Sequence, residues 1–101
     1  MELKNTKFEM LDVKVFKTRK EMGHEAARDV EARLKRIISE KGEATVVFAA
    51  APSQNELLEG LCSADVDWTR VRALHMDEYI GLPKDHPAGF GNFLRRAIFV
   101  R

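Results

Sequence analysis

Ala44-Thr-Val-Val-Phe-Ala-Ala-Ala51 is the stretch on which the fold of this chain depends. A short, unbroken, β-branched apolar run before a turn predicts a strand buried on both faces, which is typical of a central parallel strand. Pro52 ends the run. The next residues, Ser53-Gln54-Asn55-Glu56, have the pattern of a capping box, so we expect a helix to begin there.

A second apolar run, Val71–Met76, follows that helix and predicts the next strand. Two adjacent carboxylates, Asp77 and Glu78, come directly after it. Consecutive parallel strands of a βαβ unit end at the same edge of the sheet. We therefore expect the turn Ala50–Asn55 and the acidic pair to lie on one rim, where open α/β sheets bind their ligands.

The chain before residue 44 predicts an edge strand and a helix. Alternation of Leu11, Val13 and Val15 with polar residues is typical of a strand with one solvent-exposed face. A capping box from Thr18 to Glu21 predicts the start of a helix, and Gly42 predicts its end. The apolar stripe of this helix is predicted to consist of Met22, Ala26, Val30, Leu34, Ile37 and Ile38.

The chain after Glu78 predicts a loop over 81–91 and a helix over 92–100. The order β-α-β-α-β-loop-α predicts an α/β fold with a parallel, Rossmann-like sheet. We divide the chain into an N-terminal arm, residues 1–10, and a domain portion, residues 11–101.

Composition limits the classes of function. The 101 residues carry a net charge of +1 with no basic stripe, so nucleic acid and membrane surfaces are not expected partners. No apolar run approaches the roughly 20 residues of a membrane span. Cys62 is the single cysteine, and the three histidines show no ligand spacing, so no metal or cofactor is predicted. We expect a cytoplasmic protein.

The predicted rim combines two kinds of chemistry. A helix N-terminus presents free N–H groups and a partial positive charge to a phosphate, and the Ser53 hydroxyl would add a donor. Asp77 could move a proton on a phosphorylated substrate. Each residue also has a plainer interpretation: Ser53 as a helix cap and Asp77 as a turn acid. The turn has neither a Walker A nor a G-x-G-x-x-G pattern.

The block His75-Met-Asp-Glu-Tyr-Ile-Gly-Leu-Pro83, followed by Asp85-His-Pro87, resembles the Met-Asp-Glu-Tyr signature of glucosamine-6-phosphate deaminases. That family shares a superfamily with the 6-phosphogluconolactonases. The resemblance runs from about Leu11 to the end of the chain. Lactonases usually carry Arg where this chain has Tyr79, so Tyr79 favours the deaminase side.

The resemblance implies conversion of glucosamine 6-phosphate to fructose 6-phosphate and ammonia, without a metal. The residue matching Asp77 moves a proton between C1 and C2 of the sugar, and the residue matching Glu78 supports it. The matching turn holds the phosphate. The implied site comprises catalytic Asp77 and Glu78, phosphate-binding Ala50, Ala51, Ser53 and Gln54, and the substrate-loop residues Tyr79 and His86.

The chain departs from the family pattern in three ways, and these departures limit the activity that we expect. Alanine stands where the family turn has glycine, and Gly89-Phe90-Gly91 stands where it tends to have Ser and Tyr. The Gly-rich second half of the family, with its ring-opening residues, has no counterpart. We therefore predict the N-terminal portion of a larger domain, with an apolar strand face left uncovered. An enzyme is expected only as part of a longer chain.

Three alternatives remain open from the residues. The first is a non-catalytic sugar-phosphate-binding or sensor domain of the same fold. The second is a 6-phosphogluconolactonase-like hydrolase. The third is a fragment that pairs with a partner chain or with copies of itself as a homo-oligomer.

Overall fold

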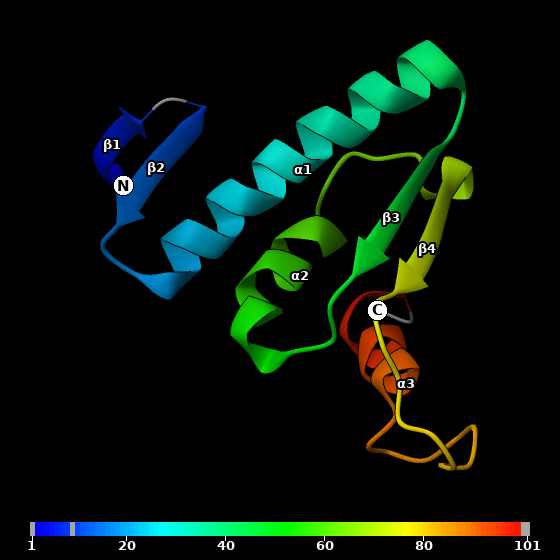
Figure 1. The fold of residues 1–101 in the computed structure, drawn as a ribbon. Coiled ribbons are helices and arrows are strands. Elements are labelled where there is room, and N and C mark those ends of the chain that lie inside the picture. The colour runs from blue at the N-terminus through cyan, green and yellow to red at the C-terminus, as the bar shows by residue number, and fades with distance from the viewer. Residues whose placement is uncertain (1, 9, 100–101) are drawn as a thin grey trace.

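The computed structural model describes residues 2–8 and 10–99 (Figure 1). Its helices and strands, in chain order, are β1 (Glu2–Phe8), β2 (Leu11–Phe16), α1 (Arg19–Lys41), β3 (Ala44–Phe48), α2 (Asn55–Cys62), β4 (Val71–His75) and α3 (Phe90–Leu94). Short 3-10 turns precede α2 and β4, at Pro52–Gln54 and Trp68–Arg70, and a π-helical turn, Arg95–Phe99, continues α3.

Strands β3 and β4 form a parallel pair, which confirms the predicted α/β class with parallel strands. Phe48 lies opposite His75 at the end of the ladder, and the Met76 N–H still donates to the Phe48 carbonyl at 2.9 Å. Strand β3 is shorter than predicted, because residues 49–51 leave the ladder to form the turn into α2. Strand β4 ends one residue earlier than predicted, at His75. The two strands therefore end side by side at one rim.

Strand β2 pairs with β1 in an antiparallel two-stranded sheet, and it does not extend the β3–β4 pair. The expectation of an edge strand in the parallel sheet was therefore wrong for β2. The predicted arm supplies β1, which offers a ladder a few residues away in sequence, with Phe8 opposite Leu11. Figure 1 shows this hairpin beside the start of α1, away from β3. The division between arm and domain stays a prediction.

Both predicted ends of α1 are confirmed. The Thr18 Oγ1 accepts the Glu21 N–H at 3.1 Å, which satisfies one of the free donors of the first turn. Gly42 adopts a left-handed conformation with φ of 83°, and its N–H donates to the Ile38 carbonyl at 2.8 Å. That conformation favours glycine at a helix C-terminus, as the sequence indicated.

Helix α1 packs against α2 through very small residues. A Cβ on Gly23 would lie 2.4 Å from the Glu56 Cβ, and a Cβ on Gly60 would lie 2.6 Å from the Ala27 Cβ. The buried face of α1 is therefore shifted from the predicted stripe toward Gly23 and Ala27, and Met22 stays half exposed. The missing side chain of Gly23 allows this close approach.

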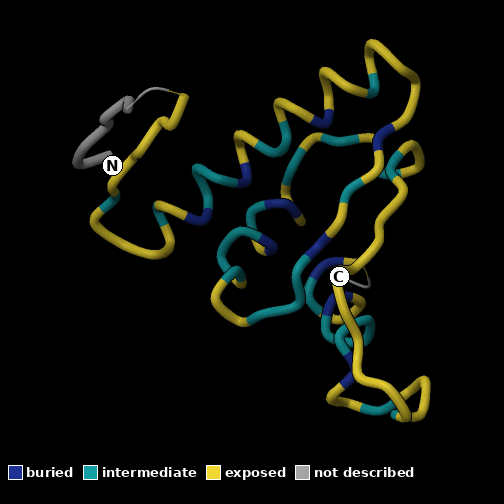
Figure 2. The backbone as a smooth tube through the Cα atoms, viewed as in Figure 1, coloured by how far each residue is buried: buried dark blue, intermediate teal, exposed yellow. Residues whose placement is uncertain are grey.

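The core lies between the helices and β3. Figure 2 shows buried segments on α1, α2, β3 and α3, whereas β4 and the loop after it are exposed. The predicted C-terminal helix begins two residues early, at Phe90, and Val100 lies outside the described residues. The buried cluster consists of Ala27, Phe48, Leu58, Leu61, Leu94 and Ile98.

Only one face of β3 is covered. Ala44 and Phe48 are buried, whereas Val47 is 60% exposed, so burial on both faces was wrong for the described residues. Leu74, the partner of Val47 in the ladder, and Met76 are also exposed. These three side chains form an uncovered apolar face, as was predicted from the sequence. Within the described residues, no helix has the length and apolarity to cross a membrane.

Candidate functional site

The turn after β3 is held by its own glutamine. The Gln54 backbone N–H donates to the Ala51 carbonyl at 3.2 Å, and its side-chain amide donates to the Ala49 carbonyl. These contacts join the two ends of the turn through one residue. Gln54 therefore shapes the turn, while Ala50 and Ala51 form its half-buried backbone.

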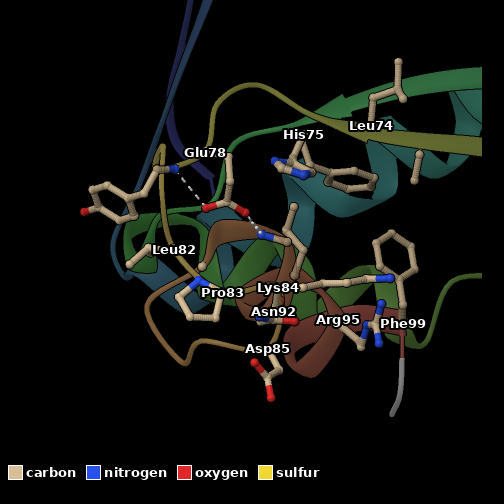
Figure 3. A pocket seen from close by; sticks show the side chains of 16 residues that line it. Leu74, His75, Glu78, Leu82, Pro83, Lys84, Asp85, Asn92, Arg95 and Phe99 are labelled. Atoms are coloured by element: carbon tan, nitrogen blue, oxygen red, sulfur yellow. Dashed lines mark hydrogen bonds between the residues drawn. The ribbon is translucent and has the colours of Figure 1, made fainter.

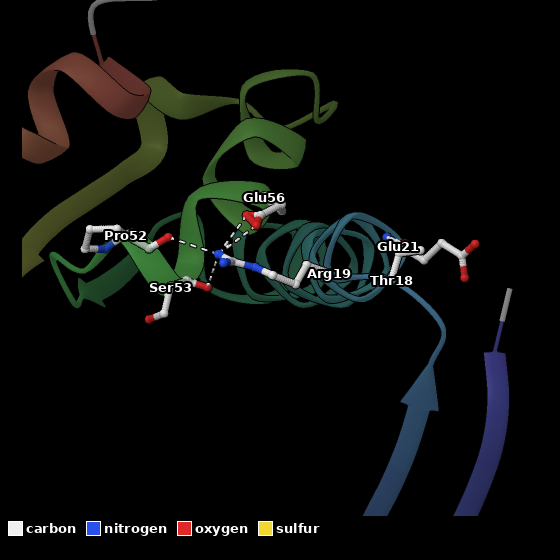
Figure 4. Close-up of polar contacts among 6 residues, drawn as sticks. All are labelled: Thr18, Arg19, Glu21, Pro52, Ser53 and Glu56. Carbon is white, nitrogen blue, oxygen red and sulfur yellow. Dashed lines mark hydrogen bonds and ion pairs between the residues drawn. The ribbon is translucent and has the colours of Figure 1, made fainter.

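Ser53 is exposed on this turn, and its side chain makes no capping hydrogen bond to the 3-10 turn or to α2. The predicted capping box at Ser53 was therefore wrong, because the 3-10 turn places Gln54 at the cap position of α2. Figure 4 shows the Ser53 hydroxyl directed away from Arg19, which contacts the Ser53 carbonyl instead. Helix capping does not occupy this hydroxyl.

The acidic pair follows β4 at the same rim. Asp77 is exposed, and its backbone carbonyl lies 2.9 Å from the His75 Nδ1. This contact fixes the chain direction just after the strand. Because Phe48 and His75 are ladder partners, the turns that follow β3 and β4 leave the sheet side by side.

Glu78 accepts backbone N–H groups from two segments. Its Oε1 accepts from Phe90 at 2.7 Å. Figure 3 shows the other two contacts, in which Oε1 accepts from Tyr79 at 3.1 Å and Oε2 accepts from Gly91 at 3.0 Å. The Gly91 N–H, followed by those of Phe90 and Tyr79, lowers the pKa of this carboxyl, and His75 lowers it further. Through these hydrogen bonds, Glu78 links the start of α3 to the segment that follows β4.

Asn92 holds the loop between these segments. Its side-chain amide donates to the Lys84 carbonyl at 2.8 Å and to the His86 carbonyl at 3.0 Å. The His86 Nδ1 accepts the Ala88 N–H at 3.0 Å, a local turn contact. Asn92 was not among the site residues predicted from the sequence. An amide residue in the first turn of a helix, just after a Gly/Pro-rich loop, was the available indication.

The glycines of Gly89-Phe90-Gly91 allow the loop to close. A Cβ on Gly89 would lie 3.2 Å from the His86 carbonyl oxygen, and one on Gly91 would lie 3.4 Å from the His75 Nε2. A side chain at Gly89 would press on the loop, whereas one at Gly91 would begin in ordinary contact with His75. The departure from the family pattern therefore goes together with a tight backbone arrangement.

A pocket of about 820 Å³ lies beside this loop (Figure 3). Glu78 and Tyr79 line it, whereas Asp77, His86 and the turn at Ala50–Gln54 do not. Tyr79 packs on Phe90 with ring centroids 4.8 Å apart. The predicted site residues therefore fall into two groups, a turn group at the end of β3 and a loop group around Glu78. The polar side chains of the pocket are His75, Glu78, Tyr79, Lys84, Asp85, Asn92 and Arg95.

Within residues 2–8 and 10–99, no group of three or more His, Cys, Asp or Glu side chains is placed to hold a metal ion. The polar groups at the rim are backbone N–H donors, hydroxyls and carboxylate acceptors, which suit an oxygen-rich organic ligand.

No family model matches the chain. A solved structure from Neisseria gonorrhoeae FA 1090, assigned as a 6-phosphogluconolactonase, superposes with a TM-score of 0.75 at 24% identity. The superposition covers 83% of this chain and 36% of that protein. At this identity the likeness defines the fold alone: the chain has the α/β fold of the 6-phosphogluconolactonase type.

Curated relatives indicate the family to which the chain belongs within this fold. The glucosamine-6-phosphate deaminase of Arthrobacter sp. (strain FB24) is 32% identical over 90 residues, which are 85% of this chain and 33% of that protein. The deaminase of Cronobacter sakazakii is 42% identical over 43 residues, or 43% of this chain and 16% of that protein. The chain belongs to the family of these glucosamine-6-phosphate deaminases. It spans about a third of the length of the Arthrobacter relative.

Proposed function

We propose that this chain supplies the phosphate turn and the general base of a glucosamine-6-phosphate deaminase-like protein. The observation that carries the proposal is the shared rim, where Phe48 and His75 end paired strands and the two candidate groups follow at once. A phosphorylated sugar bridging this rim would place its phosphate at one turn and its reacting carbons near the other.

The phosphate end of the proposal rests on the turn at the start of α2. Ser53 is exposed and its hydroxyl is not used as a helix cap. The N-terminal end of α2 adds partial positive charge. In this assignment Ser53 donates to the phosphate, Ala50 and Ala51 supply backbone, and Gln54 keeps the turn in shape.

The chemical end rests on Asp77. In the proposed reaction, Asp77 takes the proton from C2 of the open-chain amino sugar and returns it to C1. Water then displaces the nitrogen from C2, so that glucosamine 6-phosphate and water yield fructose 6-phosphate and ammonia. Glu78 is occupied by three backbone N–H groups, so its proposed part is to position Asp77 and Tyr79 rather than to move a proton.

The partner in this proposal is therefore a small-molecule sugar phosphate. His86 belongs to the loop that Asn92 closes, and its ring already accepts the Ala88 N–H. We assign His86 to shaping the substrate loop.

The test is the Asp77→Asn variant of the protein that carries this chain. Ammonia release from glucosamine 6-phosphate should be lost, while binding of the sugar phosphate, measured by calorimetry, should persist. Asp65→Asn is the matched control, since that exposed carboxylate pairs with Lys35 away from the rim. Turnover that survives Asp77→Asn would remove Asp77 as the base.

A non-catalytic sugar-phosphate-binding role is the second candidate, and the position of Asp77 outside the lining of the pocket favours it. Binding without ammonia release by the unmodified protein would select this candidate. Hydrolysis of 6-phosphogluconolactone would instead select the lactonase.

A further inference from the structure

The side chain of Arg19 reaches from the first turn of α1 to the turn that precedes α2. Its Nη2 lies 3.3 Å from the Pro52 carbonyl oxygen and 3.5 Å from the Ser53 carbonyl oxygen. The same nitrogen lies 2.8 Å from one Glu56 carboxylate oxygen and 3.2 Å from the other. Figure 4 shows this guanidinium between the two backbone carbonyls and the carboxylate. These contacts join segments more than thirty residues apart in sequence.

The packing of α1 on α2 places Arg19 at this point. Along α1, Arg19, Gly23 and Ala27 follow at spacings of four, and so do Pro52, Glu56 and Gly60 along the facing segment. Gly23 touches Glu56, and Ala27 touches Gly60. Arg19 and Pro52 form the next step of the same seam. The Thr18 cap fixes the first turn of α1, so the origin of the Arg19 side chain is fixed as well.

We propose that Arg19 is a positioning residue for the phosphate turn, an inference that rests on the proposed function. By accepting from the guanidinium, the Pro52 and Ser53 carbonyls face α1. The Ser53 hydroxyl then points the other way, out of the seam (Figure 4). Arg19 thereby keeps carbonyl oxygens, which would repel an anion, away from the side of the turn where the phosphate binds.

All four contacts come from one nitrogen, Nη2, at the end of a planar guanidinium, whereas a lysine ammonium is a compact point charge on a flexible stem. The Arg19 side chain is 65% exposed, so its ion pair with Glu56 contributes little to global stability. The effect of Arg19 is therefore expected on ligand affinity and on the local turn, and much less on unfolding.

The test compares Arg19→Gln, Arg19→Lys and the control Arg28→Gln. Arg28 is an exposed arginine of the same helix that pairs only with Glu25 among the contacts described for it. The probes are glucosamine 6-phosphate and its unphosphorylated counterpart glucosamine, titrated by calorimetry into the protein that carries this chain. The melting temperature and the amide exchange of residues 51–56 are measured in parallel.

Arg19→Gln should raise the Kd for glucosamine 6-phosphate by about tenfold, because misplaced donors lose much of their contribution. Arg19→Lys should recover part of the affinity, and Arg28→Gln should leave it unchanged. Amide exchange at residues 51–56 should become faster in Arg19→Gln, while the melting temperature stays close to that of the unmodified protein.

Three results would overturn the inference in distinguishable ways. If the unmodified protein binds the sugar phosphate and Arg19→Gln binds it equally well, Arg19 does not position the turn, and the proposed function stands. A melting temperature that falls in Arg19→Gln with unchanged Kd would assign Arg19 a purely structural role. If the unmodified protein does not bind glucosamine 6-phosphate, the proposed function fails and the inference with it.

Discussion

Gly23 on α1 and Glu56 on α2 lie so close that a Cβ on Gly23 would stand 2.4 Å from the Glu56 Cβ. This contact sets the distance between the two helices. One turn earlier along α1, the same distance allows the Arg19 side chain to reach the turn that precedes α2. The same small residue therefore connects helix packing with the geometry of the candidate phosphate turn.

Gly23→Ala should destabilise the protein, although alanine is the better helix former by about 1 kcal/mol. The added methyl group would clash with Glu56 and with the backbone of Leu57, and such overpacking costs about 1–3 kcal/mol. Urea denaturation measures the change in the free energy of unfolding. Ser39→Ala, at an exposed position of α1, is the control and should be neutral or slightly stabilising. A more stable Gly23→Ala protein would show that the helices can move apart freely.

Glu78→Gln should loosen the loop between β4 and α3. A neutral amide accepts the Tyr79, Phe90 and Gly91 N–H groups more weakly than a carboxylate does. Faster amide exchange at Phe90 and Gly91 is the expected result. The control is Asp85→Asn, which changes an exposed carboxylate of the same loop. Equal exchange in the two variants would contradict the role given to Glu78.

Acid should have the same effect as Glu78→Gln. Because the folded state lowers the pKa of Glu78, the carboxylate contributes stability above its ordinary pKa. That contribution is lost as the pH falls below about 4.3 and through the lower folded pKa. Exchange at Phe90 and Gly91, or the nearby NMR shifts, should follow this titration in the unmodified protein. The titration should be absent in Glu78→Gln, and its persistence there would point to another group.

Asn92→Ala should open the loop that carries His86. The change leaves the Lys84 and His86 carbonyls without their side-chain donor, at a cost of about 1 kcal/mol for each lost hydrogen bond. Proteolytic cleavage between residues 83 and 89 should become faster. Asn55→Ala, on the exposed start of α2, serves as the comparison. Unchanged cleavage would mean that Glu78 alone holds the loop.

The uncovered face of β3 and β4 should drive self-association of the chain. Val47, Leu74 and Met76 are exposed together, and contiguous apolar patches on a surface favour contact with other protein surfaces. Leu74→Lys should shift the chain toward monomer in sedimentation experiments. Met10→Lys removes an exposed apolar residue of the β1–β2 hairpin and should have no such effect. A monomeric unmodified chain would contradict this prediction.

The local features of the fold were predictable from short stretches of sequence. The Thr18 cap and the Gly42 end of α1 depend on contacts three or four residues apart. The apolar runs before Pro52 and Asp77 predicted parallel strands, because strands that alternate with helices are typical of a parallel sheet. The expected burial of β3 on both faces was not found. The Asp-Glu-Tyr block likewise indicated the family that the comparisons support.

Features that depend on distant contacts were decided only by the tertiary structure. Pairing of β2 with β1, the close approach at Gly23, and the reach of Arg19 to Pro52 follow from how the elements pack. Glu78 became a backbone acceptor because α3 brings two N–H groups to it from twelve and thirteen residues away. The spacing of apolar residues and the identity of capping residues depend on local geometry, so the sequence by itself determined where the helices and strands form. Packing of those elements against one another determined which polar groups meet at the rim.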